Sequence, residues 1–149
     1  MNFSKLAARV LLLVGAFVSV AHAQISLTLK QGFITKYKDR ATIEAECTVD
    51  KSKGKANPAS KDGDMHITVR CPGEIKLPLV AEIMNAKEFS DVITRTAQDE
   101  QSQEKVRIVG AWRIWNEHSG DTGFEQGRPV THAPNSNPDH VFEIRPVRV

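Results

Sequence analysis

The stretch of sequence that decides the fold runs from Val106 to His118 and reads V-R-I-V-G-A-W-R-I-W-N-E-H. Its apolar residues recur at every second position, and side chains two residues apart lie on the same face of a β-strand. Both tryptophans of the protein belong to this stretch, which ends in the polar group Asn116, Glu117 and His118. The pattern predicts a central strand with one face on the core, leading into a polar end where a site could lie.

Four other segments carry strand patterns. Ala41–Val49 and Met65–Cys71 alternate apolar and polar residues, which is typical of half-buried strands. His140–Val149 alternates in the same way. Ile25–Tyr37 is predicted to be a long first strand, and Gly32 inside it indicates a bulge or a bend.

One helix is predicted between the third strand and the central strand. From Pro78 to about Gln98 the apolar residues follow a helical period, and Pro78 suits the first turn of a helix. Two segments are rich in polar, glycine and proline residues and are predicted to be loops: Asp50–Asp64, which carries four lysines, and Ser119–Pro138. A loop as long as the second one often carries function in a small domain.

The predicted order of elements, β-β-β-α-β-β, resembles that of the five-stranded oligonucleotide/oligosaccharide-binding (OB) barrel. The alternatives are an α+β roll or a small open sandwich with one helix packed on the sheet. The segments G-D-M-H-I (63–67), V-A-E-I-M-N (80–85) and D-H-V-F-E-I (139–144) resemble those of uncharacterised exported bacterial proteins. The barrel resemblance implies that a ligand would meet the outer faces of the second and third strands, rimmed by loops.

The first 23 residues have the pattern of a signal peptide. Lys5 and Arg9 precede the apolar run Val10–Val20, and small residues at positions 21 and 23 suit cleavage after Ala23. The apolar run is short for a membrane span, so the sequence predicts no transmembrane anchor after processing. We therefore expect a single domain over residues 24–149, in the periplasm or secreted.

Charge argues against a polyanionic partner. Removal of residues 1–23 takes away two of the 20 basic residues and none of the 18 acidic ones, which leaves a neutral chain. A neutral chain has no overall attraction to nucleic acid, so composition does not favour nucleic acid as a partner.

The two cysteines, Cys47 and Cys71, fall on the core faces of two different predicted strands. In an oxidising compartment, an even pair in a small domain indicates a disulfide. A redox-active or metal-binding thiol pair is the alternative, but the pair lacks the C-x-x-C spacing.

Polar side chains at predicted strand ends form a first candidate site: His66, Glu117, His118 and His140, with Asp64 nearby. Imidazoles and carboxylates could hold a divalent metal ion or act as general acid and base. The alternative is that these side chains satisfy buried polar partners at the strand ends.

A second candidate site is the outward face of the central strand, with Arg107, Arg113 and Trp115, since arginine beside tryptophan makes a stacking surface for a sugar or a base. Arg113 is also expected to pair with Glu143 if the last two strands are neighbours. The alternative for Trp115 is that it covers the sheet surface.

Taken together, the sequence predicts an exported, disulfide-containing binding domain without a cofactor. The expected partner is a small molecule, an oligosaccharide or a protein of the cell envelope. The second hypothesis is a small metal-binding protein or metal-dependent hydrolase, since a divalent metal is the cofactor that these side chains would suit. No G-x-S-x-G or nucleotide-binding glycine motif occurs, so a non-enzymatic role is favoured. The predicted binding residues are His66, Arg70, Arg113, Trp115, Glu117, His118 and His140.

Overall fold

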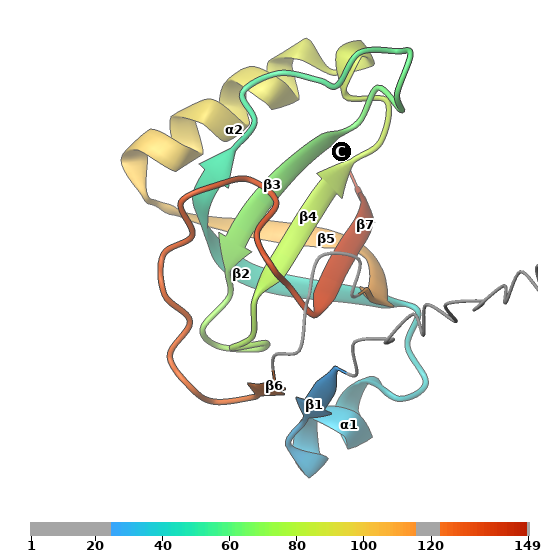
Figure 1. The fold of residues 1–149 in the computed structure, drawn as a ribbon, viewed down its shortest axis with the longest axis vertical. Helices are drawn as coiled ribbons and strands as arrows, with labels where there is room; N and C mark the ends of the chain where they lie inside the picture. Colours follow the sequence, from blue (N-terminus) through green and yellow to red (C-terminus); the bar gives the residue numbers. More distant parts are fainter. Residues whose placement is uncertain (1–24, 116–122, 149) are drawn as a thin grey trace, which may run out of the picture.

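The structure is a computed structural model that describes residues 25–115 and 123–148, and its centre is a closed five-stranded β-barrel (Figure 1). The barrel strands are β2 (Thr42–Ser52), β3 (Met65–Arg70), β4 (Leu79–Ile83), β5 (Lys105–Ile114) and β7 (Phe142–Val147). They follow the order β2-β3-β4-β7-β5, and all neighbours are antiparallel except β4 and β7. Helix α2 (Ser90–Ser102) connects β4 to β5. The prediction of a mainly β, OB-like barrel is confirmed.

The barrel contains a different set of segments from the predicted one. The segment Ile25–Tyr37 is not a strand of the barrel. It forms the short strand β1 (Ser26–Thr28) and helix α1 (Gln31–Tyr37). The reason lies in its spacing, because Phe33 and Tyr37 are four residues apart and both rings pack on Trp112.

The predicted helix from Pro78 to Gln98 is also wrong in its first half. That half contains strand β4 and the 3₁₀ turn η1 (Ala86–Glu88), and α2 starts only at Ser90. Every residue of β4 is buried, Glu82 included, so its sequence L-V-A-E-I shows no alternation of apolar and polar residues. Such segments cannot be assigned to helix or strand by periodicity.

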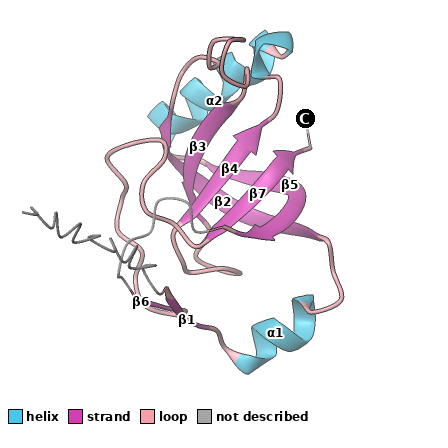
Figure 2. Ribbon diagram, turned by 45° about the vertical axis from the view of Figure 1, so that its right-hand side comes forward, coloured by secondary structure: helices cyan, strands magenta, loops and turns pink. Residues whose placement is uncertain are grey.

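An aromatic cluster attaches α1 to the barrel. The ring of Trp112 stacks on that of Phe142 with 4.3 Å between centroids, and Phe33 and Tyr37 of α1 pack against this pair. Beside α1, β1 pairs in parallel with β6 (Gly123–Glu125). In both ribbon views α2 lies at one end of the barrel, and α1 with the β1–β6 pair lies at the other (Figures 1 and 2).

The closure of the barrel depends on Gly110. Strand β5 pairs with β7 through an irregular register between Gly110 and Trp112. A β-carbon at Gly110 would collide with the Ile144 side chain and the Pro146 carbonyl oxygen. The close approach of these two backbones therefore requires glycine at this position.

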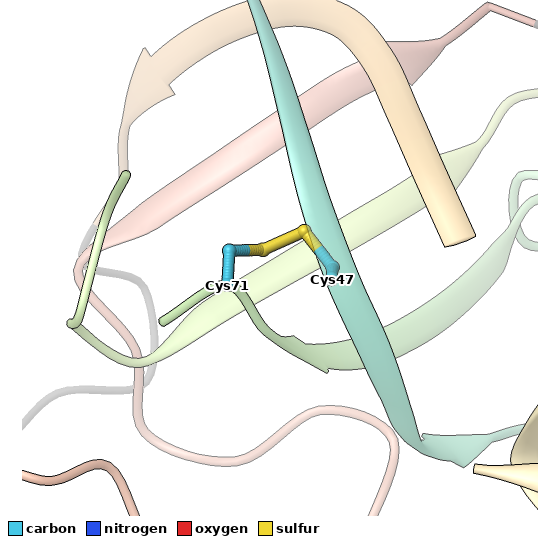
Figure 3. Close-up of a disulfide and its surroundings, with 2 residues drawn as sticks. All are labelled: Cys47 and Cys71. Atoms are coloured by element: carbon cyan, nitrogen blue, oxygen red, sulfur yellow. A yellow bond between two sulfur atoms is a disulfide. The ribbon is translucent and has the colours of Figure 1, made fainter. Parts of the chain in front are cut away.

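Cys47 and Cys71 form a disulfide, as the sequence predicted (Figure 3). Cys47 lies in β2 and Cys71 directly follows β3, and both are buried in the core. The bond joins two strands that pair along one side of the barrel. It therefore closes a covalent loop made of the end of β2, the β2–β3 connection and β3, and this loop carries residues of both sites described below.

Glu100 fixes the last turns of α2 to the end of β2. Its carboxylate accepts hydrogen bonds from Lys51 Nζ at 2.6 Å and from the backbone N and side-chain Oγ of Ser52 at 2.8 Å each. Burial raises the pKa of Glu100, but the hydrogen bonds from Lys51 and Ser52 together outweigh burial, so its pKa lies below the ordinary value of 4.5. The ionised form is the one that holds the helix in place.

We expect Glu100→Gln to lower the free energy of unfolding by about 1 kcal/mol at pH 7. A carboxyl whose pKa is depressed by folding contributes stability above its unfolded pKa, and this contribution is lost as the pH falls through the folded pKa. The difference between wild type and variant should therefore shrink below about pH 4. Urea unfolding at pH 7 and pH 3 measures it, with Glu88→Gln in the exposed turn η1 as the control. A difference that is the same at both pH values would contradict the role of Glu100.

Candidate functional site

The outer face of β3 carries His66, Thr68 and Arg70, as the alternation predicted, while its other face is in the core. The segment after β6 lies across this face, and Thr68 Oγ1 donates a hydrogen bond to the Asn135 carbonyl at 2.9 Å. This contact buries Thr68 and leaves His66 and Arg70 partly exposed on either side of it. The outer face of β3 therefore presents two separate ends, one around Arg70 and one around His66.

A cavity of about 290 Å³ lies at the Arg70 end, between β3 and the segment from Gly123 to Asp139. We call it the β3 cavity. Apolar residues line the cavity from the β3–β4 connection and from the segment after β5: Leu77, Pro78, Phe124, Val130, Ala133 and Pro138. Apolar walls with a few polar groups are typical of small-molecule sites, and this volume is at the small end of their range.

A buried ion pair holds the β3 cavity in shape. The Asp50 carboxylate is fully buried, and its Oδ1 accepts a hydrogen bond from Arg70 Nε at 2.5 Å. Its Oδ2 accepts a hydrogen bond from the backbone N of Ala133 at 3.1 Å, and His132 Nε2 lies 3.9 Å from Oδ1. Asp50 of β2 therefore contacts both β3 and the segment after β6.

Asp50 was not predicted as a site residue. Sequence periodicity placed the end of the strand at Val49 and assigned Asp50 to a loop, whereas β2 continues to Ser52. The register between β2 and β3 shifts between Val49 and Lys51. Such a bulge breaks the alternation, so Val49 and Asp50 are both buried although they are consecutive.

Cationic side chains surround the β3 cavity. Arg70 uses only its Nε on Asp50, and among the described residues its two terminal nitrogens have no hydrogen-bond partner. Lys76 also lines the cavity and has no ion-pair partner in the described ranges. Arg128 contacts Glu125 at 2.8 Å, and both side chains are exposed. A second cavity of about 310 Å³ is also lined by Arg70, Lys76 and Arg128, so these three side chains lie between the two cavities.

The His66 end of the same face is rich in acid. His66 Nε2 lies 3.2 Å from Glu82 Oε1, and Glu82 on β4 is the direct cross-strand neighbour of His66. Arg145 Nε lies 2.9 Å from Glu82 Oε2, and an Arg145 terminal nitrogen lies 3.7 Å from Asp64 Oδ2. The contact with Glu82 raises the pKa of His66, and burial raises the pKa of Asp64. The cross-strand pairing thus concentrates titratable groups here.

Of the predicted set His66, Glu117, His118 and His140, the structure describes the two histidines His66 and His140. His140 is fully buried, with Nδ1 2.7 Å from the Pro138 carbonyl oxygen and Nε2 3.1 Å from Glu143 Oε1. It serves a buried polar partner at a strand end, which was the alternative interpretation. Glu117 and His118 lie outside the described residues.

Arg113 and Trp115 do not line the β3 cavity. Arg113 pairs in register with Glu143, as expected, but the predicted ion pair is absent from the described structure. The reason is that Glu143 is buried against His140, whereas the Arg113 side chain is exposed. Trp115 is half-buried, and its backbone N donates to the Val141 carbonyl at 2.9 Å.

Both ends of the β3 face are built from side chains that lie far apart in the sequence. The groups at the Arg70 end come from β2, β3, the β3–β4 connection and the segment after β6. Their arrangement therefore follows from the barrel topology rather than from a short motif. No protein-family model, curated protein or solved structure matches this chain.

Proposed function

We propose that this chain is an exported, non-enzymatic binding domain whose ligand occupies the β3 cavity. The observation that carries the proposal is the cavity itself, with apolar walls and a few convergent polar groups, on the outer face of β3. In OB barrels the corresponding face and its rim of loops are where ligands bind. The resemblance of this barrel to that fold therefore supports the same location.

The ligand class that the cavity fits is a small organic anion. The terminal nitrogens of Arg70 and the ammonium group of Lys76 have no protein partner in the described chain, so both can contact a carboxylate or a phosphate group. The apolar walls would enclose the hydrocarbon part of such a ligand. Asp50 is the one buried acid among the residues that line the cavity, and it already contacts Arg70 and Ala133, so it positions Arg70 rather than repelling the anion.

Export is supported by the disulfide, since disulfides persist in oxidising compartments. The described helices include none that is long and apolar enough to cross a membrane. The signal peptide predicted for residues 1–23 lies outside the described part of the chain. Its cleavage after Ala23 stays a prediction, and N-terminal sequencing of the protein from an exporting host would test it.

Lys76→Gln should weaken the binding of small carboxylates about fivefold, because it removes one cation without creating a buried charge. The probes are short aromatic and aliphatic carboxylates, each paired with the neutral alcohol of the same skeleton. Binding is followed by amide chemical shifts of residues 68–70, 128 and 130–133. Alcohol binding should not respond to Lys76→Gln, and Lys87→Gln, at an exposed lysine away from the cavity, is the control.

Two results would contradict the proposal in different ways. Equal affinity for carboxylates and alcohols would refute the anionic class but keep the cavity as the binding site. Shifts located elsewhere on the barrel, or no shifts with any probe, would refute the β3 cavity as the site.

A further inference from the structure

We propose that the His66 end of the β3 face is a binding site for a hard divalent cation, formed by Asp62, Asp64 and Glu82. The structure places one carboxylate oxygen of each residue within 4.8 Å of those of the other two. We call these three residues the carboxylate cluster. The site is independent of the β3 cavity, since none of the three residues lines that cavity.

The second observation is that two carboxylate oxygens of the cluster are buried without a hydrogen bond. Asp64 and Glu82 are each only 1% exposed to solvent. Asp64 Oδ2 and Glu82 Oε2 accept no hydrogen bond from any described residue. Each of the two oxygens has an ion-pair contact with Arg145, at 2.9 Å for Glu82 Oε2 and 3.7 Å for Asp64 Oδ2, and a buried carboxylate oxygen without a hydrogen bond is costly.

The remaining oxygens of the same side chains are already engaged, and this fixes where the two unbonded oxygens point. Asp64 Oδ1 accepts a hydrogen bond from the backbone N of Asn85 at 2.8 Å, and Glu82 Oε1 contacts His66. Asp64 Oδ2 and Glu82 Oε2 both face the Arg145 guanidinium. They therefore converge on one point at the end of β3, β4 and β7.

Carboxyl groups outnumber the permanent cations at this point. The cluster holds three carboxyl groups, and Arg145 is the one permanent cation that contacts them in the described structure. Arg145 reaches Glu82 Oε2 as an ion pair without hydrogen-bond geometry. Carboxylates at such separations repel one another unless a cation or a proton joins them.

The ligand atoms favour a hard cation such as Ca²⁺ or Mn²⁺, because all three are carboxylate oxygens. Asp62 is held in place, since its Oδ1 accepts hydrogen bonds from the Asp64 backbone N at 3.0 Å and from Asn57 Nδ2 at 2.8 Å. Arg145 is 25% exposed, so its side chain can turn towards solvent when a cation enters. In this arrangement His66 orients Glu82 and is not itself a ligand.

The test is isothermal titration of the chelator-treated protein with Ca²⁺ and, separately, with Mn²⁺. We expect one site per chain in wild type, and a loss of affinity of at least about tenfold in Asp64→Asn. Asp62→Asn provides a second variant at an exposed position, where loss of charge does not endanger folding. Asp91→Asn, at an exposed position in the first turn of α2, is the matched control and should bind like wild type.

Arg145→Gln distinguishes a cation site from a structural ion-pair cluster. Removing the positive charge beside the carboxylates should tighten cation binding about tenfold, because the cation no longer competes with the guanidinium. A purely structural cluster predicts a less stable protein that binds no cation. The proposal is overturned if wild type binds neither ion at about 5 mM, above the range of weak extracellular Ca²⁺ modules. It is also overturned if Asp62→Asn binds as wild type does, or if Arg145→Gln binds no more tightly.

Discussion

Replacement of both Cys47 and Cys71 by alanine lowers the free energy of unfolding by about 3 kcal/mol and the melting temperature by about 10 °C. The bond spans 24 residues, so it removes much of the freedom that the unfolded chain has between β2 and β3. These residues include Asp50 of the β3 cavity together with Asp62 and Asp64 of the carboxylate cluster. Urea unfolding of wild type and double variant, followed by circular dichroism, measures the difference.

Reduction of the wild-type protein is the control for this prediction. Cys→Ala also removes two buried sulfur atoms, which contributes a packing loss of its own. Wild type in the presence of dithiothreitol keeps those atoms, so its loss of stability isolates the contribution of the bond. If the reduced and oxidised wild-type proteins unfold at the same urea concentration, the disulfide does not stabilise the barrel.

Alternation predicted those barrel strands that have one buried and one polar face. Ala41–Val49 became most of β2, Met65–Cys71 contains β3, and Val106–His118 contains most of β5. Alternation fails for β4, because all five of its residues are buried and no polar face marks the period. The predicted order of elements still matched the barrel because two errors cancelled. Ile25–Tyr37 was wrongly counted as a barrel strand, and β4 was missed.

The candidate sites were predictable only where they depend on one strand. A period of two residues was enough to place His66, Thr68 and Arg70 on one outer face. The contact of His66 with Glu82 requires the pairing of β3 with β4, and β4 had been predicted as helix. Arg145 reaches the cluster because β7 lies parallel to β4, a pairing that no local pattern in the sequence indicates.

Arg70→Met is expected to lower the free energy of unfolding by about 2 kcal/mol, the second-largest effect that we predict. The change leaves the Asp50 carboxylate buried without its ion-pair partner, and breaking one side of a buried pair is more costly than removing both. The expected loss is below that of a fully buried pair because the Arg70 side chain is one-third exposed. Urea unfolding at neutral pH measures it.

The double variant Asp50→Asn, Arg70→Met tests the cause of that loss. An amide at position 50 can still accept the hydrogen bond from the Ala133 backbone N, and it needs no counter-charge, so the double variant should recover about half of the lost stability. It should also keep the amide shifts of residues 131–133 close to those of wild type while binding carboxylates more weakly than wild type. If the double variant is no more stable than Arg70→Met, the cost lies in lost packing of the arginine stem rather than in the unpaired charge. The electrostatic role assigned to Asp50 in shaping the cavity would then be wrong. If stability recovers but carboxylate binding does not, Arg70 has two separate roles: it neutralises Asp50, and it contacts the anion.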